Sequence, residues 1–186
     1  MKELALSILI ALSLNACANG SSCNSKRTEY NNSKLYSGKL EYTIPKSWMR
    51  VSPSNPMRIE QFRLKGPANS EDAELSIYHF PGKGGSVENN LKRWISKFED
   101  TSALKKEKFN LGKLPITKVY ISGTYLKSSA PMIIDSPKIK LENYSMLALM
   151  VETADGPWFF KAVGPQASVD LNLPSINSFQ KSFCIK

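Results

Sequence analysis

Apolar and polar residues alternate along much of this chain, and glycine or proline ends most of these runs. Alternation with a period of two predicts strands that bury one face. Asp155-Gly156 lies between two such runs and is a strong hairpin signal. The predicted strands are residues 39–44, 57–64, 73–80, 109–111, 116–126, 144–153 and 158–163. The chain is therefore expected to build an antiparallel sheet.

Two segments have a helical rather than a strand period. Ser86 is a natural N-cap, and the apolar residues after it recur on one helical face: Val87, Leu91, Trp94, Ile95 and Phe98. Residues 168–183 form the second helical segment, with Ile176, Phe179 and Phe183 at helical spacing. The order of elements predicts one α+β domain over residues 35–186, an antiparallel β-sheet flanked by helices.

The amino terminus reads as an export signal. Its apolar run, residues 4–14, is about 11 residues long, whereas a permanent membrane helix needs about 20. Leu14-Asn15-Ala16-Cys17 resembles the lipobox of bacterial lipoproteins. The resemblance implies removal of residues 1–16, diacylglycerol on the Cys17 thiol and acylation of the new amino group. The alternative is an ordinary small-x-small cleavage site that releases a soluble protein.

Residues 17–34 then read as the lipidated cysteine and a flexible tether rich in Gly, Ser and Asn. Ala18, not Asp, follows Cys17, which resembles lipoproteins sorted to the periplasmic face of the outer membrane in bacteria with two membranes. The expected location is thus the bacterial cell envelope, with the lipid anchor holding the protein to a membrane.

Two cysteines remain after Cys17, namely Cys23 and Cys184. Export permits a disulfide between them, and two unpaired thiols are the alternative. On the chain-entropy model so long a loop contributes up to about 5 kcal/mol. The bond would shorten the tether to about five residues.

The net charge is +9, and the basic residues are scattered along the chain. In a nucleic-acid-binding protein the basic residues would lie on one face beside aromatic residues, so no nucleic-acid partner is expected. An acidic envelope polymer, anionic lipid or an unknown envelope protein suits an exported basic domain better. The alternative is a solvated positive surface.

Several short segments resemble a group of uncharacterised bacterial exported proteins and lipoproteins. These segments are residues 74–80, 82, 84–90, 93–94, 121–125, 159–161, 164–165 and 182–183. Together with Pro45 and Trp48, their layout is similar to the PsbP-like superfamily, which also contains the Mog-type Ran-binding proteins. Over residues 38–184 the resemblance implies an α/β/α sandwich and a protein that is not an enzyme. No functional residue carries over.

His79 is the only histidine, so a metal site built on several imidazoles is excluded. It shares strand parity with Leu75 and Ile77, which favours a structural or rim position. The densest acidic cluster is Glu71-Asp72-x-Glu74; it is interpreted as a solvated loop and strand start, with a cation or glycoside site as the alternative.

The loop 82–86 has physical features that favour anion binding. Lys83, Gly84, Gly85 and Ser86 combine free helix amides, little side-chain bulk and a cation, which makes them candidates for anion binding. A tight structural turn is the alternative. We expect a non-catalytic envelope lipoprotein without cofactor, metal or catalytic residues. The alternative is a small hydrolase or anion-binding protein that uses loop 82–86 and His79.

Overall fold

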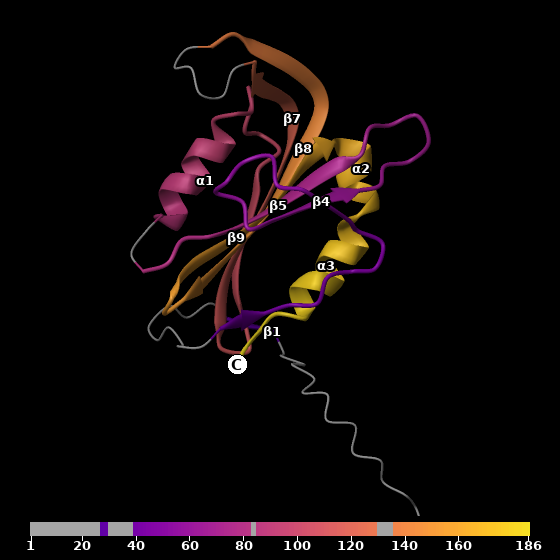
Figure 1. The fold of residues 1–186 in the computed structure, drawn as a ribbon. Coiled ribbons are helices and arrows are strands. Elements are labelled where there is room, and N and C mark those ends of the chain that lie inside the picture. Colours follow the sequence, from indigo (N-terminus) through magenta and orange to yellow (C-terminus); the bar gives the residue numbers. More distant parts are fainter. Residues whose placement is uncertain (1–26, 30–38, 83–84, 130–135) are drawn as a thin grey trace, which may run out of the picture.

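The computed structural model describes residues 27–29, 39–82, 85–129 and 136–186, which form ten strands and three helices (Figure 1). Eight strands make one sheet in the order β1-β6-β7-β8-β9-β5-β4-β3, and neighbours pair antiparallel. Their bounds are β1 Arg27–Glu29, β3 Met49–Val51, β4 Glu60–Leu64, β5 Ala73–His79, β6 Lys105–Leu111, β7 Leu114–Ser128, β8 Lys138–Thr153 and β9 Gly156–Pro165.

The remaining elements lie against this sheet or close the carboxyl end. β2 Leu40–Glu41 pairs with β10 Cys184–Ile185 in a small second sheet. The helices are α1 Val87–Ile95, α2 Gln166–Leu171 and α3 Leu173–Lys181. Figure 1 shows α1 on one side of the large sheet and α2 and α3 on the other. No helix in the described ranges is both long and apolar enough to cross a bilayer.

The central strands bury both faces of the sheet. Side chains along β8 alternate between two clusters, as the period of a strand requires. Leu147, Leu149 and Val151 join the cluster under α2 and α3, whereas Met146, Ala148 and Met150 join the cluster under α1. One sheet thus carries two apolar cores.

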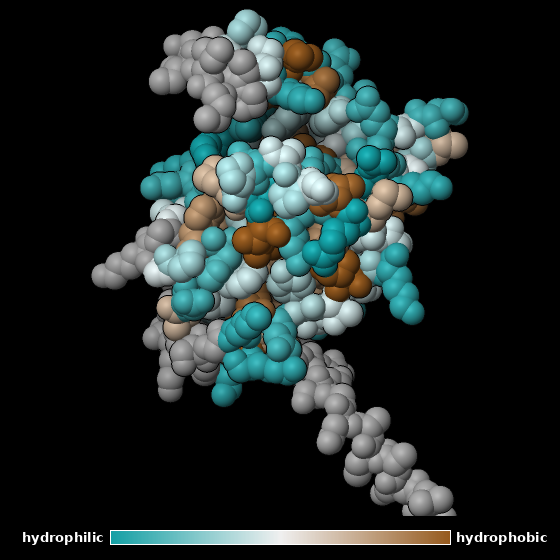
Figure 2. All heavy atoms as spheres, viewed as in Figure 1, coloured by the Kyte–Doolittle hydropathy of each residue, from teal (hydrophilic) through white to brown (hydrophobic). Residues whose placement is uncertain are grey.

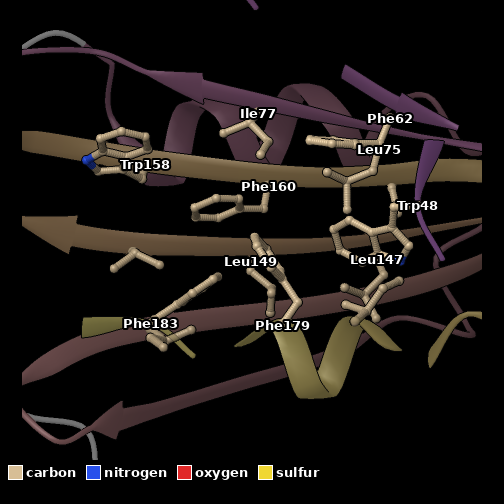
Figure 3. Packing of buried hydrophobic residues seen from close by; sticks show 14 of the residues in the cluster. Trp48, Phe62, Leu75, Ile77, Leu147, Leu149, Trp158, Phe160, Phe179 and Phe183 are labelled. Atoms are coloured by element: carbon tan, nitrogen blue, oxygen red, sulfur yellow. The ribbon is translucent and has the colours of Figure 1, made fainter. Parts of the chain in front are cut away.

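Aromatic and aliphatic residues pack together in the core under α3, as Figure 3 shows. The Phe179 ring lies 4.9 Å from Trp48, 5.3 Å from Phe160 and 4.8 Å from Phe183, between ring centroids. The Trp48 indole nitrogen also donates a hydrogen bond to Ser175 Oγ, 3.0 Å away. These contacts fix the carboxyl-terminal helix on the sheet.

The predicted amphipathic helix at Ser86 is confirmed. Ser86 Oγ accepts a hydrogen bond from the Asn89 backbone amide, 3.3 Å away, as an N-cap should. Leu91 and Trp94 are buried against the sheet, and Phe98, just after α1, is buried with them. Two backbone bonds, Glu99 N to Thr124 O and Leu126 N to Lys97 O, then join the segment after α1 to β7.

The predicted α+β class is wrong. The fold is mostly β, with 49% of the described residues in strands and 17% in helices, so the α/β/α sandwich expected from the PsbP-like layout does not describe it. Polar stretches explain the difference: Lys105–Leu111 begins with four exposed residues and β8 with three, yet both continue the sheet. Backbone pairing with β7 extends them without apolar alternation.

Other boundaries also differ from expectation. The run 39–44 forms only the two-residue β2, and the segment 168–183 contains two short helices divided at Asn172. β1 lies within residues 17–34, where a flexible tether was predicted, and pairs with β6. The hairpin at Asp155-Gly156 is confirmed, because Thr153 and Gly156 pair across it.

Large apolar side chains reach the surface at five described positions. They are Met49, Met57, Ile59, Ile139 and Leu171. On the face of Figure 2, hydrophobic residues are separate spots among hydrophilic ones. Exposed apolar residues scattered in this way are normal for a folded domain and indicate no binding surface by themselves.

Candidate functional site

The predicted anion loop is only partly within the described residues, since Lys83 and Gly84 lie outside them. The Ser86 hydroxyl serves as the helix cap, and its carbonyl accepts from the Asn90 amide, 3.0 Å away. Gly85 has a φ of 83°, and a Cβ there would lie 3.2 Å from the Phe80 ring. The described part of this loop is thus a close turn, and its anion binding stays a prediction.

His79 and Ser86 are not brought together. The His79 ring stacks on Trp158 at 4.2 Å between centroids, and its Nε2 lies 3.6 Å from Asp155 Oδ2. Its parity with Leu75 and Ile77 places it on the α3 side of the sheet, whereas Ser86 begins the helix on the other side. Within the described ranges, no serine hydroxyl is hydrogen-bonded to His79. The alternative of a hydrolase that uses loop 82–86 and His79 stays a prediction.

Cys184 is disulfide-bonded in the structure. It lies in β10, which pairs with β2. Both other cysteines of the chain, Cys17 and Cys23, fall outside the described residues. The particular pair Cys23 and Cys184 therefore stays a prediction, as does lipidation of Cys17.

The acidic cluster is divided among separate partners. Glu71 accepts a hydrogen bond from the Tyr144 hydroxyl, 3.2 Å away, and Asp72 accepts one from the Gly66 amide, 2.9 Å away. Glu74 pairs with Arg58 instead. Among the residues that the structure describes, no group of three or more His, Cys, Asp or Glu side chains could hold a metal ion.

A cationic group that the sequence reasoning missed lies between α1 and the sheet. Lys161, in β9, points to the α1 side together with Phe159, whereas Phe160 points to the α3 side. Its Nζ lies 5.1 Å from the centroid of the Trp94 ring and 5.9 Å from that of Tyr78. Its side chain is thus largely buried between two aromatic rings.

We call this group and its surroundings the Lys161 cluster. Its members are Arg58, Glu74, Tyr78, Arg93, Trp94, Lys97 and Lys161. Burial first, and then the positive charges of Lys97, Arg58 and Arg93, lower the pKa of Lys161 from 10.5 to about 8, while Glu74 opposes them. The Lys97 pKa is also lowered, first by burial and then by Arg93. Lys161 thus lies near three other cations and, among the described residues, near one carboxylate, that of Glu74.

The Glu74 carboxylate already accepts hydrogen bonds from donors other than Lys161. Glu74 Oε1 lies 2.8 Å from Arg58 Nη1, and its Oε2 accepts a hydrogen bond from Gln61 Nε2 at 2.7 Å. Ser76 Oγ donates to Oε1 at 3.1 Å. Arg58 in turn donates to the Tyr78 hydroxyl at 3.2 Å. Across the described part of the chain, the Lys161 ammonium makes no hydrogen bond and no salt bridge, and it lies over the Trp94 and Tyr78 rings.

Half-buried tyrosines adjoin the cluster. Tyr125 stacks on Tyr144 with 6.1 Å between ring centroids. Burial raises the Tyr125 pKa, and the nearby Tyr78 and Glu74 raise it further. Tyr125 therefore lies near Tyr78, Glu74 and Arg58 of the Lys161 cluster.

One sequence signal could have pointed to Lys161. It is the only charged residue in the aromatic run 158–163, at the same parity as the buried Phe159. Trp94 and Arg58 come from distant segments, and no periodicity links them to β9.

No protein-family model matches this sequence, and no curated protein matches it.

Proposed function

We propose that this protein is a lipid-anchored component of a bacterial envelope that binds an acidic envelope polymer and catalyses no reaction. The Lys161 cluster carries the proposal, because among the described residues its largely buried ammonium forms no ion pair with a carboxylate and lies beside three further cations. Positive charge that the fold itself does not neutralise favours an anionic partner.

The anchor part of the proposal rests on the resemblance of Leu14-Asn15-Ala16-Cys17 to a lipobox. Cys17 would carry diacylglycerol on sulfur and an acyl chain on nitrogen. Two or more buried chains hold a protein on a membrane stably, whereas one chain holds it only marginally. The periplasmic face of the outer membrane is the proposed place where the bacterium has two membranes.

Acylation is tested by metabolic labelling with an alkyne-tagged palmitate in a bacterial host, followed by membrane fractionation. The wild type should be labelled and sediment with membranes, whereas Cys17→Ser should be unlabelled. Cys23→Ser is the matched control, because it removes a nearby thiol and should keep the label. A wild type without label, or a labelled Cys17→Ser, would contradict the anchor.

Binding is tested separately by crosslinking in the native envelope followed by mass spectrometry. Crosslinks to an acidic glycan through residues 39–186 support the binding role. Capture of neutral glycan alone, or of no envelope polymer, would contradict it. Because this readout does not use the lipid, it can fail or succeed independently of acylation.

A further inference from the structure

We propose that the Lys161 cluster is a site for the carboxylate of an acidic sugar, with the Lys161 ammonium as its ion partner. This inference deepens the proposed binding function and rests on it. The sugar class follows from which groups in the cluster are unpaired, which are occupied, and what surrounds them.

The unpaired groups set the charge of the ligand. The Lys161 ammonium lies over the Trp94 and Tyr78 rings, and within the described ranges it makes no hydrogen bond and no salt bridge. Arg93, exposed on α1, donates one bond to Asn90 at 2.7 Å and keeps other N–H groups free. A ligand with a single negative charge would therefore contact the Lys161 ammonium at the centre of the cluster and the exposed Arg93 at the edge of the cluster.

The occupied groups argue for a carboxylate rather than a phosphate. Phosphate is usually held by arginine forks or by the amides of a helix N-terminus. Arg58 already bonds to Glu74, Tyr78 and Ser54. Arg93 lies in the last turn of α1 and Lys97 follows that helix, so the free amides of α1 lie at its other end. One lysine ammonium suffices for one carboxylate.

The neighbouring rings argue for a sugar. Tyr78, Tyr125 and Tyr144 are aromatic residues that are each only partly buried. Such a ring offers an apolar face to the C–H groups of a sugar, and its hydroxyl can bond to sugar hydroxyls. The Tyr144 hydroxyl already donates to Glu71, so Tyr78 and Tyr125 are the rings we assign to the ligand.

The test is isothermal titration of the full-length protein, solubilised in detergent, at pH 7. The probes are a galacturonate oligomer, the neutral galactose oligomer of equal length and inorganic phosphate. We expect heat from the galacturonate oligomer only. Lys161→Met should weaken its binding about tenfold or more, the scale of a charge-assisted bond.

Lys181→Met is the matched control, because it removes the same charge from an exposed residue of α3 on the opposite side of the sheet. It should bind as the wild type does. Lys97→Met is a second variant at the rim and should weaken binding less than Lys161→Met. Circular dichroism shows whether each variant is folded.

Three results would overturn this site: no galacturonate binding by the wild type, equal binding by folded Lys161→Met, or equal binding of the neutral oligomer. Tighter binding of phosphate than of galacturonate would overturn the sugar class. If crosslinking in the envelope still captures an acidic polymer after such a result, only this inference fails. If it captures none, the proposed function fails with it.

Discussion

Replacing Lys161 with methionine should stabilise the fold while abolishing the charge that the proposed site needs. Methionine keeps much of the length and the apolar stem but carries no charge. In the folded protein the pKa of Lys161 falls from 10.5 to about 8. At about 1.4 kcal/mol per pH unit, this shift sets an upper limit of about 3 kcal/mol on the penalty of the charged form.

Residual hydration of the ammonium and its contacts with Trp94 and Tyr78 offset part of that penalty. We therefore expect Lys161→Met to gain about 1–2 kcal/mol at pH 7. The gain should depend on pH. Between pH 8 and 10.5 the unfolded chain binds more protons than the folded one at this residue, so wild-type stability rises there and the advantage of the variant shrinks.

Urea unfolding of the full-length protein at pH 7 and pH 9.5 measures both effects. Lys181→Met, which removes an exposed charge, should change stability by less than about 0.5 kcal/mol. The upper pH limit matters because the raised pKa of Tyr42, about 12, makes the fold lose stability above about pH 10. A variant less stable than the wild type, or an advantage equal at both pH values, would refute the reasoning.

Three further changes probe the fold. Gly156→Ala should cost about 2–4 kcal/mol, because its φ is 115° and the new Cβ would clash with the Phe80 carbonyl oxygen; an unchanged urea midpoint would contradict the hairpin geometry. Phe179→Ala should cost about 3–5 kcal/mol by emptying the aromatic core, and Phe179→Leu much less; equal losses would be unexpected. Dithiothreitol should lower the melting temperature of the wild type but not of Cys184→Ser, and a wild type insensitive to it would contradict a stabilising bond.

Local signals in the sequence predicted much of the sheet and one helix. Ser86 with its apolar stripe defines α1, and Asp155-Gly156 marks the hairpin of β8 and β9. Both depend on residues close together in the chain. The long polar halves of β6 and β8 were missed because their pairing with β7 supplies the order, and no apolar period accompanies it. That omission led to the wrong fold class.

The candidate site was harder to predict for a similar reason. Lys161 alone looks like one charge in an aromatic strand, and its significance comes from Trp94 on α1 and Arg58 before β4. Glu74 was noticed only as part of an acidic cluster. Which cation it pairs with, and which one it leaves unpaired, depends on packing between segments far apart in the sequence.

The most direct test of the Lys161 cluster is NMR titration of the Lys161 side chain in the full-length protein, with and without the galacturonate oligomer. Without ligand we predict a pKa of about 8. A bound carboxylate favours the protonated ammonium, so saturation should raise this pKa, by about one unit or more. A Lys161 pKa near 10.5 in the free protein, or one unmoved by the ligand, would contradict the account.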